Sequence, residues 1–330
     1  MFERPKRPVK RYRFDLDISV SARWSPILDD HNAQIPKVRQ VVDDILHKFG
    51  VSGMKYRLLS WLISSYKKHA MRMYSEELEY ISGKTGIELS KLLLIQLLYE
   101  VSASSTSIVM NLENGTHAMF SIMDWPLSIL KDITIELEFC RNGRTLFIAP
   151  TWVGCVGVFT AHVPNNYTVA VSSRGTQNTN CMSFWSILQN VKCVMDFAWP
   201  VCYLIRSTAE SGLPVDKAMD ILQNASILGP CFITVFDHLS PPRSCVITRD
   251  TVSAVIRYAD QSAKYLLQTD CHHDTMQPLC KLVDELVNSK HWLRVEEMYK
   301  DLSVFPIINE ETIYACVTHD NPKNDITTNV

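Results

Sequence analysis

The spacing of apolar residues changes near residue 101, and this change limits the folds that the chain can adopt. Over residues 38–49 apolar side chains recur at helical spacing, and residues 87–101 are apolar nearly all round, as in a buried helix. Over residues 133–139 apolar and polar side chains alternate instead, which is the period of a half-solvated strand. A helical N-terminal region followed by mostly strands is therefore expected.

The same patterns predict an α+β protein in which two antiparallel sheets pack face to face with helices outside. Its 330 residues can bury roughly three quarters of their surface, and no linker separates two domains, so one structural domain is expected. Helices are predicted at 36–49, 54–73, 76–82, 87–101, 183–226 with breaks near Pro200 and Pro214, 276–288 and 291–301. Strands are predicted near residue 14 and at 105–110, 116–123, 133–139, 145–149, 155–161, 167–172, 231–236, 244–248, 252–258, 264–269 and 311–318.

Charge and hydropathy exclude some classes of function. With 33 Lys and Arg against 35 Asp and Glu, the net charge of −2 argues against a nucleic-acid binder that acts through bulk positive charge. Six basic residues gather between Arg4 and Arg13. They suit a peripheral contact with anionic lipid or a sorting signal, but we favour a solvated arm broken by Pro5 and Pro8. Without a signal-like apolar stretch, the sequence as written predicts a cytoplasmic chain.

Most common catalytic and metal-binding motifs are missing from the sequence. It contains no GxGxxG, GxxxxGK[ST], HExxH, GxSxG or CxxC pattern, so nucleotide-binding, zincin, α/β-hydrolase and zinc-ribbon readings lack their signatures. Cys271-His272-His273-Asp274 has no second ligand pair at suitable spacing and is expected to be a polar loop. We therefore expect neither a metal nor another cofactor.

Hydroxyl residues are dense where the long buried helix meets the first strand. Ser104-Ser105-Thr106-Ser107 begins this strand directly after the helix. Such residues can simply cap the helix end. They also resemble the junction at which amidases of the N-terminal nucleophile class cut their own chain.

The sequence around this junction resembles the acid ceramidase and N-acylethanolamine acid amidase family. Residues 99–109, YEVSASSTSIV, are similar to the family's YE(I/V)SAxCTSIV, and Ser105 stands at the position of the family's cysteine. Similar stretches follow in order over nearly the whole chain, at residues 13–17 with 23–24, 83–89, 123–125, 151–154 with 157–158, 229–231 and 246–249. The resemblance implies a four-layer αββα sandwich like that of choloylglycine hydrolases, an N-acyl lipid substrate and, by analogy, a lysosomal location.

The resemblance also implies roles for particular residues. A break before Ser105 would divide the chain into a helical segment, 1–104, and a core, 105–330. Ser105 would then be the nucleophile and its freed α-amine the general base, with Asp124 holding both in place. The family's QTNxD pattern, whose asparagine helps hold the oxyanion, is similar to Gln268-Thr269-Asp270.

Several of the family's catalytic positions are altered here. Ser121 replaces an arginine, Ser173 a glutamate and Asp270 the asparagine, whereas Arg174 is retained. Lys290 is the nearest match to a further family arginine, and Arg294 is the alternative. Loss of one oxyanion donor alone costs about 10²–10³ in rate.

Three readings remain open at this stage. The chain can be an amidohydrolase of ceramide or N-acylethanolamine, a pseudoenzyme that binds acyl lipid or a partner without turnover, or an unrelated structural protein with a chance motif. Apolar residues expected near the cleft, or in the core, are Trp125, Leu127, Trp152 and Phe159.

Overall fold

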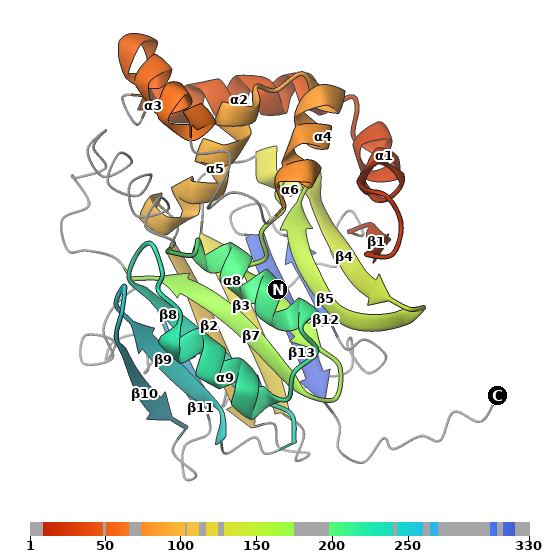
Figure 1. Cartoon of the computed structure of the whole chain (residues 1–330). Helices are drawn as coiled ribbons and strands as arrows, with labels where there is room; N and C mark the ends of the chain where they lie inside the picture. The colour runs from red at the N-terminus through yellow and green to blue at the C-terminus, as the bar shows by residue number, and fades with distance from the viewer. Residues whose placement is uncertain are drawn as a thin grey trace.

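Two β-sheets stacked face to face form the centre of the molecule, as the computed structural model in Figure 1 shows. Helices from the N-terminal third lie at one end of the sheets, and a pair of later helices covers one outer face. This arrangement confirms the predicted α+β sandwich. The structure describes residues 9–48, 51–65, 74–102, 104–111, 117–124, 129–174, 198–239, 243–259, 265–269, 304–308 and 313–320.

The larger sheet has eight strands in the order β1-β4-β5-β6-β7-β8-β9-β10. Their bounds are β1 Arg11–Asp15, β4 Thr134–Arg141, β5 Arg144–Trp152, β6 Thr160–Val163, β7 Tyr167–Ser173, β8 Cys231–Asp237, β9 Cys245–Arg249 and β10 Ala254–Tyr258. The smaller sheet has five strands in the order β11-β2-β3-β13-β12. Their bounds are β11 Tyr265–Gln268, β2 Ser104–Asn111, β3 His117–Asp124, β13 Ile313–Asp320 and β12 Val304–Ile308.

The helices fall into two groups. The first group consists of the helices of the N-terminal third together with α6, which follows β3. Their bounds are α1 Val20–Asp30, α2 Ile35–Lys48, α3 Gly53–Ser65, α4 Ser75–Thr85, α5 Leu89–Ser102 and α6 Ile129–Ile133. The other group is the pair α8 Val201–Glu210 and α9 Val215–Asn224, which packs on the outer face of the larger sheet. The predicted helices at 276–288 and 291–301, which would form a fourth layer, lie outside the described residues.

The two faces of the larger sheet differ in polarity. On β7, Val169 and Val171 belong to the core shared with α8 and α9, so with a period of two the other side chains face the smaller sheet. That inner face carries buried polar side chains, including Thr160, Thr168 and Thr234. The layer between the sheets is therefore partly held by hydroxyl groups.

The structure differs from the sequence-based expectation at two places. β1 pairs with β4 in parallel, a pairing that needs a long connection, and the helices α1 to α6 with the strands β2 and β3 provide it. Residues 155–159 were expected in a strand but form a loop that ends at β6. This loop follows Gly154, whose φ of 88° turns the chain out of the sheet.

Candidate active site

The predicted site residues fall where strand ends from both sheets meet. β2 pairs with β3 so that Ser105 lies opposite Met123 and Ser104 lies opposite Asp124. On the other side of β2, Gln268 at the end of β11 lies opposite Ser107. Packing of β2 against β7 adds the end of a third neighbouring strand. The start of β2 and the ends of β3, β7 and β11 thus lie at one end of the sandwich.

Ser105 is buried, with 1% of its surface exposed. Its Oγ donates a hydrogen bond to the carbonyl oxygen of Val171 on β7, at 3.3 Å. Helix α5 ends at Ser102, so Ser105 does lie at a helix-to-strand junction, as expected. In the uncut chain its hydroxyl is directed at the larger sheet rather than at solvent.

Two further hydroxyl contacts join the sheets beside Ser105. Ser107 Oγ lies 2.6 Å from Thr234 Oγ1, and both side chains are fully buried. Ser121 pairs with Ser107 in the strand register and accepts a bond of 3.5 Å from Thr160 Oγ1. Ser121 therefore lies in the polar layer near Ser105, where it supplies a hydroxyl and no positive charge.

Arg174 follows the last residue of β7, at the same end of the sandwich. Its Nη1 lies 2.7 Å from the Asp250 carboxylate, and its side chain is 23% exposed. The preceding Ser173 pairs with Cys231 on β8. The retained arginine thus has an acidic partner, Asp250, that no motif in the sequence singles out.

The remaining predicted site residues are only partly placed. Asp124 is the last residue of β3, and its backbone lies beside the Ser104–Ser105 bond. Asp270 follows directly after the described Thr269, but it lies outside the described residues, as does Lys290. The same is true of Arg294, Trp125, Leu127 and the 271–274 stretch.

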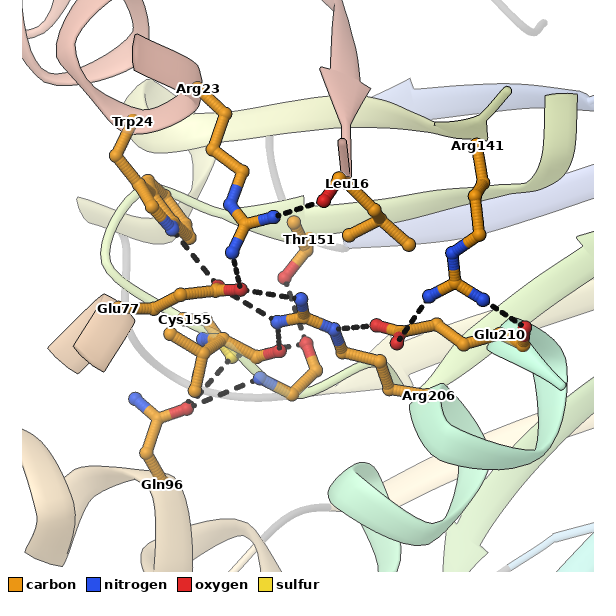
Figure 2. Close-up of polar contacts among 12 residues, drawn as sticks. Leu16, Arg23, Trp24, Glu77, Gln96, Arg141, Thr151, Cys155, Arg206 and Glu210 are labelled. Carbon is orange, nitrogen blue, oxygen red and sulfur yellow. Dashed lines mark hydrogen bonds and ion pairs between the residues drawn. The ribbon is translucent and has the colours of Figure 1, made fainter. Parts of the chain in front are cut away.

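A buried ion cluster that no sequence motif signals lies between the helical segment and the core (Figure 2). Arg206 of α8 is 1% exposed and donates two hydrogen bonds to the carboxylate of Glu77 on α4, at 2.7 and 2.9 Å. Glu77 also accepts bonds from Trp24 at 3.0 Å and pairs with Arg23 at 3.2 Å, both on α1. The ring of Tyr74 lies 3.9 Å from the Arg206 guanidinium carbon.

Charge complementarity compensates for the burial of this cluster. Burial alone would raise the pKa of the Glu77 carboxyl, but the charge and hydrogen bonds of Arg206, helped by Arg23, lower it below its ordinary value. Arg206 also donates to Glu210 on its own helix, at 2.7 Å. The cluster therefore stays ionised at neutral pH and fastens α1 and α4 to α8.

The loop after β5 links this cluster to the helix that leads to Ser105. Arg206 Nη1 donates to the Val156 carbonyl at 2.7 Å. The Gln96 side-chain oxygen, on α5, accepts the Val156 N–H at 3.1 Å and the Gly157 N–H at 3.4 Å. These contacts fix the position of α5, whose next element is β2.

An apolar cavity of about 90 Å³ lies between the N-terminal helices and the end of β5. Side chains of α1, α2, α4, α5 and α6 line it, together with Trp152 and Phe159, whose ring centroids are 5.7 Å apart. Ser105 is not among the lining residues, but Ile95 and Gln96 of the preceding helix are. Two of the four apolar residues expected near a cleft thus line this cavity.

Neither a metal cluster nor a membrane span is found in the part of the chain that the structure describes. Three or more His, Cys, Asp or Glu side chains nowhere come together in it as metal ligands would. None of its helices combines the length and apolar character needed to cross a bilayer.

Comparison with known proteins gives matches over nearly the full length of this chain. It is 29% identical over 313 residues to an uncharacterized protein of Acanthamoeba polyphaga mimivirus, covering 92% of this chain and 94% of that relative. It is 24% identical over 334 residues to the acid ceramidase of Balaenoptera acutorostrata scammoni, covering 94% and 83%. It is 25% identical over 319 residues to the N-acylethanolamine-hydrolyzing acid amidase of Mus musculus, covering 93% and 84%. No protein-family model matches.

Among solved structures, the fold matches the Caenorhabditis elegans ortholog of N-acylethanolamine-hydrolyzing acid amidase. The TM-score is 0.50 with 23% sequence identity, over 64% of this chain and 91% of the other. The shared fold is that of N-terminal nucleophile hydrolases, as the resemblance at the helix-to-strand junction implies. Over nearly its whole length the chain is thus similar in sequence to acid ceramidases and N-acylethanolamine acid amidases, and its fold is similar to that of one of the latter, which supports the family assignment that the junction sequence suggests.

Proposed function

We propose that this chain hydrolyses the amide bond of N-acyl lipids, with Ser105 as the nucleophile after the chain breaks between Ser104 and Ser105. The observation that carries the proposal is the meeting of the start of β2 with the ends of β3, β7 and β11. This meeting gathers Ser105, Asp124 and Arg174 at one end of the sandwich. Acyl transfer needs a nucleophile, a base and polar or charged groups near one another, and strand ends that meet at one place can supply them.

The proposed reaction begins with the neutral α-amine of residue 105, whose ordinary pKa near 8 suits a general base. The amine takes the proton of the Ser105 hydroxyl while Oγ attacks the amide carbon of the lipid. The tetrahedral intermediate collapses as the amine of the leaving group takes that proton. Water then attacks the resulting ester, the fatty acid leaves, and the Ser105 hydroxyl is restored.

The neighbouring residues would tune this reaction. Asp124 would hold the α-amine, and Arg174 would supply positive charge once it leaves Asp250. An ionised Asp270 has no hydrogen to donate to an oxyanion, whereas its protonated form at acidic pH does. Acidic pH therefore supplies this donor but also protonates most of the α-amine, so we expect a slow enzyme.

The apolar cavity would hold part of the acyl chain. Its volume of about 90 Å³ is smaller than the roughly 150 Å³ engineered cavity that holds benzene. A complete long acyl chain therefore needs further opening between the N-terminal helices and β5, whereas a short terminal segment fits. Trp152 and Phe159 would contact that segment.

The second candidate is a pseudoenzyme that binds acyl lipid without turnover. The hydrogen bond from Ser105 to Val171 favours it, because the hydroxyl has a stable partner in the uncut chain. The hydroxyl at Ser121 favours it as well, since the family's positive charge is missing there.

One experiment separates the two candidates. The purified full chain is incubated at about pH 4.5, where Asp carboxyls are partly protonated, and its intact mass is recorded. Ceramide and an N-acylethanolamine are then added, and released fatty acid is measured. Hydrolysis predicts fragments 1–104 and 105–330 and fatty-acid release, whereas the pseudoenzyme predicts a single 37.7 kDa species that retains bound lipid.

Variants of the two neighbouring serines control this experiment. Ser105→Ala is expected to abolish cleavage and release, and Ser105→Cys to increase both, because a thiol is partly ionised before attack. Ser107→Ala removes a buried hydroxyl from the same strand and should still cleave. Cleavage in Ser105→Ala, or neither release nor lipid binding in the wild-type chain, would contradict both candidates.

A further inference from the structure

An open cavity with charged walls lies beside the buried ion cluster, between the starts of α1 and α4 and the ends of β4 and α8. Its volume is about 260 Å³, which holds a small organic molecule rather than a single water. It shares no lining residue with the apolar cavity, and Ser105 does not line it. Six of its nine lining residues are charged: Arg23, Arg141, Arg206, Glu76, Glu77 and Glu210.

The charges around this cavity are equal in number but separated in space. The inner carboxylates are those of Glu77 and Glu210, and all three arginines of the lining pair with these two. This leaves one positive charge in excess at the inner end. Glu76 is exposed in the first turn of α4 and has no ion-pair partner within the described part of the chain. The cavity therefore offers positive charge inside and negative charge at its outer side.

Two buried donors beside the inner end have no hydrogen-bond partner among the described residues, Arg23 Nε and the Tyr74 hydroxyl. The other nitrogens of Arg23 contact the Leu16 carbonyl at 3.4 Å and the Glu77 carboxylate at 3.2 Å. Burial holds the pKa of Tyr74 above its ordinary value of 10, so the hydroxyl keeps its proton and can donate. Buried donors are rarely left without an acceptor, so two of them beside one cavity indicate that a ligand supplies it.

Arg141 reaches the same space from β4. Its side chain is 43% exposed, and its two contacts with Glu210 are long, 3.3 Å to the carbonyl and 3.7 Å to the carboxylate. Figure 2 shows Leu16 between Arg23 and Arg141. A guanidinium has five N–H donors and binds carboxylates with two parallel bonds, so Arg141 has donors left for a second carboxylate.

We propose that this cavity binds a small zwitterion of the amino-acid class, with its carboxylate beside Arg23 and Arg141 and its ammonium group beside Glu76. The partly buried Leu16 and Val20 form an apolar wall that an aliphatic side chain of the ligand would contact. Binding requires neither chain cleavage nor the hydrolysis proposed above. The two proposals can therefore fail separately.

The test is isothermal titration calorimetry of the full chain at neutral pH with glycine, L-valine and L-leucine. L-valine should bind more tightly than glycine, because the apolar wall contacts its side chain. Isovalerate lacks the ammonium group of valine, and isobutylamine lacks its carboxylate. Each of these two should bind at least about tenfold more weakly than L-valine, because half of the charged contacts are lost.

Variants of the lining assign the two ends of the ligand. Glu76→Gln should weaken L-valine binding by about tenfold and leave isovalerate binding unchanged, whereas Arg141→Gln should weaken both. Tyr74→Phe should weaken both by about fivefold, because it removes one hydrogen bond. It keeps the ring that lies 3.9 Å from the Arg206 guanidinium carbon, so the loss reports on the hydroxyl.

Two matched controls change the same kinds of group away from the cavity. Glu79→Gln alters an exposed carboxylate on the same helix, and Tyr167→Phe removes another buried hydroxyl that has no partner among the described residues. Both should bind L-valine like the wild type. Equal loss in Glu76→Gln and Glu79→Gln, or in the two Phe variants, would overturn the proposal. So would isovalerate binding as tight as that of L-valine, which would identify a simple anion site, or no binding of any of the three amino acids at about 10 mM.

Discussion

At the scale of single residues, the buried pair Glu77–Arg206 is the most consequential feature. Both side chains are at most 4% exposed, and each provides most of the compensation for the other's charge. A buried pair of this kind adds little net stability compared with apolar residues of the same shape, but loss of one partner leaves a buried charge uncompensated. The pair therefore strictly constrains how α4, which carries Glu77, packs against α8, which carries Arg206.

Glu77→Gln should lower the free energy of unfolding by about 3–5 kcal/mol, because Arg206 stays charged and buried. Adding Arg206→Met should cost less than the sum of the two single changes. Urea unfolding of the single and double variants measures this. As the control, Lys217→Ala removes the exposed pair with Asp220 and should change stability by less than about 1 kcal/mol. Additive losses at 77 and 206 would contradict the prediction.

The buried His162 and the half-buried His238 make the sandwich sensitive to acid. His162 Nδ1 lies 3.0 Å from Thr168 Oγ1, which lies 2.8 Å from His238 Nε2. Burial, helped by the charge of Arg11, lowers the pKa of His162 from 6.5 to about 4. The unfolded chain then binds the proton more tightly, so the stability due to a neutral His162 is lost as pH falls from about 6.5 towards 4.

Between pH 7 and about 4.5, this group should reduce the free energy of unfolding by about 2–3 kcal/mol. His162→Asn should reduce the pH dependence by that amount, although it also lowers stability at pH 7. Chemical denaturation of both proteins at the two pH values provides the measurement. Identical pH dependence in the two proteins would show that His162 does not titrate as its burial predicts.

At the scale of elements, the period-two pattern was sufficient to place most strands. The strands expected at 105–110, 167–172 and 231–236 correspond to β2, β7 and β8, with ends that differ by one residue. Prolines located the breaks before α8 and α9 equally well. These elements were predictable because local spacing and burial agree.

Elements decided by distant contacts could not be predicted in this way. The apolar run 155–161 has strand composition, but its N–H groups at Val156 and Gly157 bind Gln96 from α5 instead of a neighbouring strand. The same holds for the site, where the resemblance suggested Ser105 and Arg174 but their partners Val171 and Asp250 follow only from the packing.

Gly157 should tolerate no side chain, because a Cβ there would lie 2.5 Å from Cys202 Sγ and 2.7 Å from its Cβ. Gly157→Ala should therefore destabilise the protein by about 1–3 kcal/mol, as the loop and α8 move apart. Gly83→Ala, within α4 and with nothing inside 4 Å, should instead stabilise it by about 0.5–1 kcal/mol. Thermal melts of the two alanine variants give the comparison, and a neutral Gly157→Ala would contradict the close packing.

At the scale of the whole molecule, residues 1–104 are integrated into the core rather than appended to it. β1 extends the larger sheet beside β4, and Arg11 pairs with the buried Glu136. Trp24 is fully buried and bonds to Glu77, which in turn holds Arg206 beyond the proposed cut. A cut before Ser105 would break one covalent bond and leave these contacts in place.

Residues 1–104 and 105–330 produced together as two chains should therefore copurify in equal amounts. Size-exclusion chromatography should give one species near the mass of the full chain, and 105–330 produced alone should aggregate, because its apolar face towards α1 and α4 is uncovered. Glu77→Ala in the shorter chain should weaken the association. Stable, monomeric 105–330 would contradict the dependence on the helical segment.

The pair Glu77–Arg206 also restricts how such a chain can diverge over time. The two positions are 129 residues apart, and a change at either one alone leaves the other buried charge with only its second partner, Arg23 for Glu77 or Glu210 for Arg206. Descendants that survive are those in which both positions are kept or both are replaced by apolar residues of similar size. Aligned relatives should accordingly show correlated replacement at 77 and 206, as expected for two residues in contact between the helical segment and the core.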